Sequence, residues 1–278
     1  MASPVSEMWT HTTVLVENDW CEKGTGFFFS RDLDDGRRKY FVATNKHVIA
    51  NEPNLRREAS EVHLHVNVRQ DGRIVGKRVT LPLRNDNDGV RLWREHPEPD
   101  VDIFVFEITK LINECQGLEY KAVSYENFAD PSTIQKQQIL PGDEVVVVGY
   151  PKGIRQGETN YPVFRQGMLA TRIDEELHEV ITVYGGHLEH VHTPRGFLID
   201  GAIIKGSSGS PVVLKPVLWM GVDEISDYLE HADPYLLGII VQTRDAPRET
   251  PAGHTESFAG LALALDADTI RETVELFF

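Results

Sequence analysis

Three polar side chains, far apart in the chain, have the types and settings that nucleophilic chemistry requires. Ser208 lies in the segment 206–209 (Gly-Ser-Ser-Gly), where the glycines allow a substrate carbonyl to approach the backbone. A serine hydroxyl is a weak nucleophile, so it needs a base, a group that orients the base and donors for the oxyanion. His47 is the candidate base, because it comes where an apolar strand over 41–43 gives way to a polar turn. Asp102 opens a second apolar strand and is the candidate orienting group.

The sequence around these residues resembles that of trypsin-like serine peptidases of the chymotrypsin superfamily, including the intracellular stand-alone domains of bacteria. The similar segments are 24–27 (Gly-Thr-Gly-Phe), 43–48 (Ala-Thr-Asn-Lys-His-Val), 102–106 (Asp-Ile-Phe-Val-Phe) and 206–211 (Gly-Ser-Ser-Gly-Ser-Pro). The resemblance implies a triad in which His47 takes the proton of Ser208 while Asp102 orients the imidazole. It also implies an oxyanion hole made by the backbone N–H groups of Gly206 and Ser208.

Asp100 is an alternative to Asp102 as the orienting carboxylate. The two residues lie two apart, so in a strand they would share a face. We prefer Asp102, since it is followed directly by the apolar strand that the resemblance requires.

The rest of the chain reads as an all-β protein with a terminal helix. Short alternating or β-branched runs, such as 62–68 and 145–148, are separated by turn signals. Near the end, Ile270, Val274 and Phe277 fall on one helical face, and Asp266 or Asp268 can cap that helix. The resemblance implies two packed six-stranded antiparallel β-barrels. We expect residues 1–130 to form the barrel with His47 and Asp102, and residues 131–278 the barrel with Ser208 and the helix.

Composition limits the partners that we expect. The net charge of −15 argues against a nucleic-acid surface, which is normally basic. No run approaches the roughly 18 apolar residues of a membrane span, and the first residues do not read as a secretory leader. Two cysteines are too few for a disulfide framework and fit a reduced compartment, although one disulfide is compatible with them. We therefore expect a cytoplasmic protein that binds neither nucleic acid nor membranes.

The substrate-binding residues follow from the resemblance and from counting back from Ser208. Ala202 is expected at the floor of the primary specificity pocket, with Ile203 and Ile204 on its wall. None of these is acidic, so we expect a small or medium apolar residue before the scissile bond. Residues expected to form the edge strand that pairs with the substrate backbone are Val241, Gln242 and Thr243.

Several histidines outside the triad need an interpretation. His187, His190 and His192 could supply metal ligands with Glu189 nearby, but a solvated hairpin explains them more simply. We interpret His63 and His65 as surface residues. The sequence thus predicts neither a metal nor a cofactor.

The main hypothesis is a serine endopeptidase that acts on proteins or peptides and that a regulatory partner in trans could restrain. A catalytically silent module that holds a peptide in the same cleft is the alternative, although silent relatives often lose a triad member. An esterase is the weakest alternative, because the segment around Ser208 lacks the strand–elbow–helix context of that fold.

Overall fold

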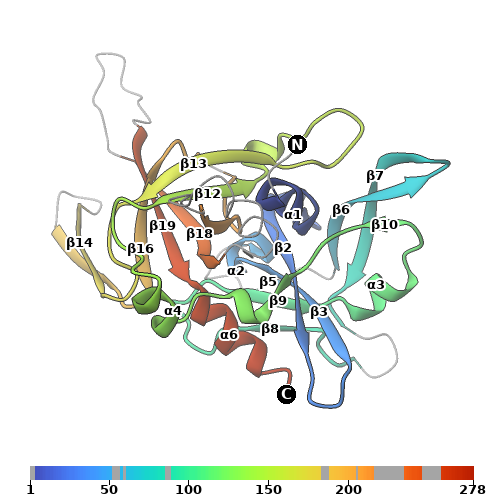
Figure 1. Cartoon of the computed structure of the whole chain (residues 1–278), viewed down its shortest axis with the longest axis horizontal. Coiled ribbons are helices and arrows are strands. Elements are labelled where there is room, and N and C mark those ends of the chain that lie inside the picture. The colour runs from blue at the N-terminus through green and yellow to red at the C-terminus, as the bar shows by residue number, and fades with distance from the viewer. Residues whose placement is uncertain are drawn as a thin grey trace, which may run out of the picture.

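The computed structural model describes residues 4–51, 57–58, 61–84, 89–182, 188–204, 206–215, 235–245 and 258–278. Two large β structures lie side by side, and the terminal helix runs along the lower edge of both in Figure 1.

A nine-stranded sheet makes up the N-terminal part of the fold. Its strands are β1 (Thr13–Asn18), β2 (Lys23–Asp32), β3 (Arg38–Thr44), β6 (Glu61–Gln70), β7 (Arg73–Pro82), β8 (Trp93–Glu95), β9 (Phe104–Glu107), β10 (Leu118–Glu119) and β11 (Val123–Ser124). They run in the order β10-β6-β1-β2-β3-β9-β8, with β7 paired to β6 and β11 to β2. Only the β11–β2 pair is parallel among these strands. The short β8, β10 and β11 extend the sheet beyond the six longer strands. Two further short strands, β4 (Ala50–Asn51) and β5 (Arg57–Glu58), pair with each other.

A closed six-stranded barrel makes up the C-terminal part, in the order β12-β13-β16-β19-β18-β17. Its strands are β12 (Glu144–Gly149), β13 (Val163–Leu169), β16 (Gly196–Gly201), β17 (Pro211–Leu214), β18 (Leu236–Asp245) and β19 (Phe258–Asp266). Between β13 and β16 the chain makes a separate two-stranded hairpin of β14 (Leu177–Thr182) and β15 (Leu188–Thr193). This hairpin projects from the side of the barrel away from the N-terminal sheet (Figure 1).

The helices in the described ranges are few and short. They are α1 (Pro4–Thr12), α2 (Lys46–Ile49), α3 (Thr109–Glu114), α4 (Pro131–Lys136) and α6 (Ala267–Glu275), with one-turn 3₁₀ segments η1 (Tyr125–Asn127) and η2 (Pro151–Gly153). Asp266 caps α6 by accepting a hydrogen bond from the Thr269 N–H, and Ile270 and Val274 are buried, as the sequence predicts. None of the described helices is long and apolar enough to cross a membrane.

A shared apolar core joins the two β structures. Phe29 and Phe41 from the N-terminal sheet belong to the same buried cluster as Val148 and Ile239 from the barrel. The cluster also includes Trp9 of α1, a helix that the sequence patterns did not predict. Burial of these side chains in one cluster keeps the two halves in a fixed relation, which matters for a site whose residues come from both.

The all-β class, one closed six-stranded barrel and the C-terminal helix are confirmed. The second six-stranded barrel that was expected is not shown, because the described strands of the N-terminal half form a nine-stranded sheet. The chain passes from the sheet to the barrel between β11 and β12. The expected boundary after residue 130 falls in this connection and stays a prediction.

Candidate active site

The structure brings His47 and Asp102 into direct contact. His47 lies on α2, the short turn that follows β3. Its Nδ1 is 2.5 Å from Asp102 Oδ2, and its backbone N–H donates to Asp102 Oδ1 at 3.1 Å. Because a carboxylate only accepts, the short contact puts a proton on Nδ1. A neutral imidazole in this tautomer has Nε2 as its acceptor, which is the atom that a general base needs.

The loop before β9 is held against α2 by two neighbours of His47. The Asn45 side-chain amide donates to the backbone carbonyl of Asp102 at 2.8 Å. The Lys46 ammonium donates to the carbonyls of His96 and Glu98 at 3.0 and 3.1 Å. These bonds fix Asp102 ahead of the strand rather than within it. Asp100, the alternative carboxylate, is exposed in the same loop, and among the described residues nothing joins it to His47.

Burial and charge act in opposite directions on His47. Partial burial lowers its pKa, but the hydrogen bond to Asp102 and the charges of Asp102 and Glu22 together raise it further. The net result is a pKa above the ordinary histidine value. His47 still presents 49% of its side-chain surface to solvent, so it can reach a substrate, whereas Asp102 presents only 20%.

Ser208 lies in the loop that connects β16 to β17. Two glycines give this loop its shape, since Gly206 has φ +90° and Gly209 has φ +83°. A Cβ on Gly209 would lie 1.8 Å from the carbonyl oxygen of Thr25, so only glycine fits there. The turn is closed by a bond from the Ser210 N–H to the Ser207 carbonyl at 3.0 Å.

The Ser208 loop is docked on the N-terminal sheet next to α2. The carbonyl of Ser208 accepts a hydrogen bond from the Thr25 N–H at 2.8 Å. A Cβ on Gly24 would lie 2.5 Å from the Val48 side chain and 3.3 Å from the Ser208 carbonyl. Ser208 and the residue after His47 therefore pack around the same glycine. This contact leaves no room for a side chain at Gly24, and it brings the Ser208 loop beside α2.

The hydroxyl of Ser208 has a defined partner in this structure. It donates to the backbone carbonyl of Val241 on β18, with a distance of 3.2 Å. Val241 lies where the pairing of β18 with β19 shifts register between Ile240 and Gln242, so the strand bulges at this point.

The expected oxyanion donors have no acceptor in the part of the chain that the structure describes. Among the residues that the structure describes, neither the Gly206 N–H nor the Ser208 N–H donates a hydrogen bond to backbone or side chain. Gly206 packs against η2, where a Cβ would lie 2.5 Å from the Lys152 nitrogen.

The expected specificity pocket is only partly supported by the surroundings of its residues. Ala202 is exposed, and its carbonyl accepts a bond from the Arg165 guanidinium at 2.7 Å. Ile204 is half-buried. Ile203 is fully buried in the apolar cluster of the barrel, which indicates a packing role rather than the expected substrate contact.

The expected edge strand is the second half of β18. Val241 and Thr243 are half-buried and Gln242 is exposed. Gln242 and Thr243 pair with Leu263 and Ala262 of β19. Val241 contacts the Ser208 loop through its carbonyl.

Two of the other histidines, His63 and His65, differ from expectation. His63 and His65 are buried, not at the surface, because the loop after η2 covers their strand: Arg155 donates to His65 Nδ1, and the Asn160 side chain donates to the Val66 carbonyl. Of the three histidines weighed as metal ligands, His187 and the side chain of His190 lie outside the described residues. His192 contacts Glu176 beside His178, a residue that the sequence patterns did not single out.

The Ser208 loop lies beside a histidine–carboxylate pair in an all-β fold with a closed barrel. This is the arrangement found in serine proteases. Residues 24–216, more than half of the chain, match the family described as trypsin-like peptidase domain, and the chain belongs to that family. No curated protein sequence matches it.

Among solved structures, the chain is similar to two crystal structures of Rv3671c, a protease of M. tuberculosis H37Rv, both described as inactive forms. Sequence identity is 16% in each case. The serine-to-alanine mutant has a TM-score of 0.47, with 98% of this chain and 89% of that chain covered. The other structure has a TM-score of 0.48, with 99% and 92% covered.

Proposed function

We propose that the chain is a serine endopeptidase that hydrolyses peptide bonds through an acyl-enzyme, with His47, Asp102 and Ser208 as its triad. The observation that carries the proposal is the two-point contact of Asp102 with His47, made next to the docked Ser208 loop. A tautomer fixed in this way is what a serine nucleophile needs from its base.

The proposed reaction has two halves. Ser208 Oγ attacks the substrate carbonyl while His47 Nε2 takes the hydroxyl proton, and the N–H groups of Gly206 and Ser208 bind the resulting oxyanion. His47 then gives the proton to the leaving amine as the C–N bond breaks, which leaves an acyl ester on Ser208. Water, deprotonated by His47, attacks the ester and releases the acid.

The hydroxyl of Ser208 must leave the Val241 carbonyl before it can donate to His47. The proposal requires this change to occur by rotation about the Cα–Cβ bond, between staggered rotamers. A substrate strand laid along β18 would compete for the same carbonyl and so favour the rotation.

The proposed substrate is a protein or peptide in extended conformation. Its backbone would pair with the strand at Val241, Gln242 and Thr243, and an apolar residue would occupy the pocket near Ala202 and Ile204. None of these five residues supplies a counter-charge for lysine or arginine. A positional-scanning peptide library tests this preference, and strong cleavage after arginine would contradict it.

We also retain three expectations as proposals. Residues 1–130 and 131–278 would act as two units that meet at the site. The cytoplasm is the proposed location, supported by Cys21 and Cys115, which are both free. A regulatory partner in trans would hold the peptidase in check.

One observation favours a second candidate, the silent peptide-binding module. In this structure the Ser208 hydroxyl is bonded to Val241, not to His47. If that bond persisted with a peptide bound, the cleft would hold peptides without cleaving them.

An active-site phosphonate probe separates the two candidates, because only an activated serine is phosphonylated. We expect the wild type to be labelled and Ser208→Ala not to be. Ser207→Ala removes the neighbouring serine of the same loop and serves as the matched control that keeps labelling. A wild type that binds peptides but is never labelled would support the silent module. Cleavage of esters without any cleavage of peptides would support the esterase.

A further inference from the structure

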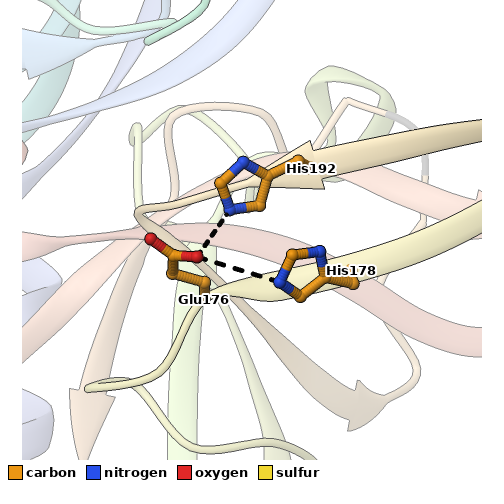
Figure 2. Close-up of side chains that lie close together, drawn as sticks. All are labelled: Glu176, His178 and His192. Atoms are coloured by element: carbon orange, nitrogen blue, oxygen red, sulfur yellow. Dashed lines mark hydrogen bonds and ion pairs between the residues drawn. The ribbon is translucent and has the colours of Figure 1, made fainter.

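A cluster of three metal-ligating side chains lies outside the active site, on the hairpin β14–β15. Glu176 stands just before β14, His178 lies on β14 and His192 lies on β15 (Figure 2). His178 and His192 are directly opposite each other in the antiparallel register. Three potential ligands from two strands therefore face one point in space.

The spacing of the ligand atoms fits a single small cation. Glu176 Oε2 is 2.9 Å from His192 Nε2 and 3.8 Å from His178 Nε2, and all three ligand atoms lie within 4.8 Å of one another. Zinc bonds of 2.0–2.2 Å in a tetrahedron put neighbouring ligand atoms ~3.3–3.5 Å apart. The two observed distances lie on either side of this value, so small side-chain rotations bring the ligands to it.

The orientation of the rings supports the same conclusion. The imidazoles of His178 and His192 are stacked, with centroids 4.6 Å apart and planes 11° apart. Stacking keeps both Nε2 atoms on the side where Glu176 lies (Figure 2).

Among the described residues, no lysine or arginine forms an ion pair with Glu176. Arg172, the nearby cation, forms ion pairs with Asp174 at 2.6 Å and with Glu175 at 2.9 Å. Glu176, the third acidic residue of this run, contacts the two histidines instead. The run thus divides into two carboxylates that neutralise Arg172 and one that faces the imidazoles.

We propose that Glu176, His178 and His192 bind a divalent transition-metal ion, with Zn²⁺ as the best fit. Two imidazoles and one carboxylate suit Zn²⁺ and its neighbours, whereas Ca²⁺ and Mg²⁺ prefer oxygen ligands. Three protein ligands leave a fourth position for water. The proposal does not depend on the peptidase mechanism.

A bound ion would have a clear structural effect on the hairpin. The two strands pair only with each other and do not extend the barrel, and an isolated two-stranded hairpin is marginally stable. An ion bridging His178 and His192 would join its strands close to where they leave the barrel. It would therefore slow the opening of the hairpin.

A second group, Asp19, Glu61 and His63, is a weaker candidate. It offers one imidazole, and that residue is buried with Nδ1 in contact with the Thr80 hydroxyl at 3.0 Å. This group serves as the competing site in the experiment.

Titration of the metal-free full chain with Zn²⁺ by calorimetry tests the proposal. We expect each of Glu176→Gln, His178→Gln and His192→Gln to remove one equivalent of bound Zn²⁺, or to weaken it by at least about 100-fold, since losing a residue that merely orients a ligand already costs 10–100-fold. The three side chains are 60%, 71% and 47% exposed, so the variants should fold, which circular dichroism checks.

Two control variants sharpen the result. Glu175→Gln removes a neighbouring carboxylate that pairs with Arg172 and should leave Zn²⁺ binding unchanged. Loss of the Zn²⁺ equivalent in His63→Gln, with wild-type binding in the three hairpin variants, would overturn the proposal. Equal binding of Ca²⁺ at the hairpin would overturn the choice of metal class.

Hydrogen exchange gives an independent readout. With Zn²⁺ present, the amides of β14 and β15 should exchange more slowly in the wild type and in Glu175→Gln, but not in His178→Gln. Unchanged exchange in the wild type under saturating Zn²⁺ would contradict a cross-strand site.

Discussion

The two halves of the active site differ in how far they are assembled. On the N-terminal side, His47 and Asp102 are joined through both carboxylate oxygens, and Asn45 holds the backbone of Asp102 in place. On the C-terminal side, the loop of Ser208 is fixed by backbone bonds, but its hydroxyl is directed to Val241. In the proposed mechanism, His47 is therefore oriented before substrate arrives, whereas the Ser208 hydroxyl must first leave the Val241 carbonyl.

This difference indicates which half of the site a substrate or partner could change at the smaller cost in free energy. Breaking the His47–Asp102 contact would leave a half-buried carboxylate without its partner. Turning the Ser208 hydroxyl exchanges one hydrogen bond for another, which costs little. We infer that a substrate or a partner would act on the serine side of the site.

The largest expected effect belongs to the nucleophile itself. Ser208→Ala should lower kcat by about 10⁶, the size of loss seen when a triad serine is removed. Ser207→Ala, in the same loop, should keep activity within about tenfold. Initial rates on a cleaved peptide measure both. Comparable rates for Ser208→Ala and the wild type would show that another group performs the chemistry.

The preformed pair is tested by Asp102→Asn, which keeps the shape of the side chain and removes its charge. We expect kcat to fall by about 10⁴, because the amide no longer holds the imidazole in the required tautomer. Asp100→Asn is the matched control, since Asp100 is exposed in the same loop, and it should change kcat by less than about twofold. The reverse ranking of these two variants would identify Asp100 as the orienting residue.

The oxyanion donors are tested by Gly206→Ala. The new Cβ would meet the Lys152 nitrogen at 2.5 Å and would require a non-glycine residue at φ +90°, so the loop must shift. We expect kcat to fall by roughly 10²–10³, as for the loss of one oxyanion donor.

Gly36→Ala controls for backbone strain alone. Gly36 has φ +80° with open space around it, so Gly36→Ala should lose ~1–2 kcal/mol of unfolding free energy from backbone strain alone. Gly206→Ala carries the same strain together with the contact to Lys152, so it should lose at least as much. Only Gly206→Ala should lose activity. Equal kcat for the two variants would argue against a catalytic role for the Gly206 N–H.

Short sequence patterns predicted those parts of the fold that depend on neighbouring residues in the chain, such as helix spacing and capping. The terminal helix follows from the spacing of Ile270 and Val274 and from the cap at Asp266. The contact of Asp102 with His47, by contrast, depends on pairing between β3 and β9, and its expectation came from the family resemblance. The bond from Ser208 to Val241 has no sequence signal, because it depends on a bulge in β18.

The histidines make contacts that short sequence patterns do not predict, because these contacts depend on residues far apart in the chain. His178 and His192 are equally far along the chain from Gly185, so a hairpin centred there places them opposite each other. This equal spacing is the sequence signal that could have predicted the pairing of the two histidines. The prediction for His65 was wrong for another reason. Its strand alternates like a half-exposed one, but Glu17 on β1 and Arg155 on the loop after η2 both contact the imidazole, which is buried.

The smallest effect concerns the charge around His47. A peptidase of this type needs neutral His47, and Asp102 and Glu22 raise its pKa, so activity should rise with pH through a midpoint above the ordinary histidine value. The same shift in pKa stabilises the fold fully below the ordinary histidine pKa, and this stabilisation is lost as pH rises through the raised pKa.

Glu22→Gln removes one of the charges that raise the pKa of His47, so the acidic limb of the kcat/KM profile should move to lower pH while its plateau stays unchanged. Glu126→Gln, whose carboxylate is not among the charges that raise this pKa, should leave the profile in place. A limb that moves to higher pH in Glu22→Gln would mean that the group titrating in the profile is not His47.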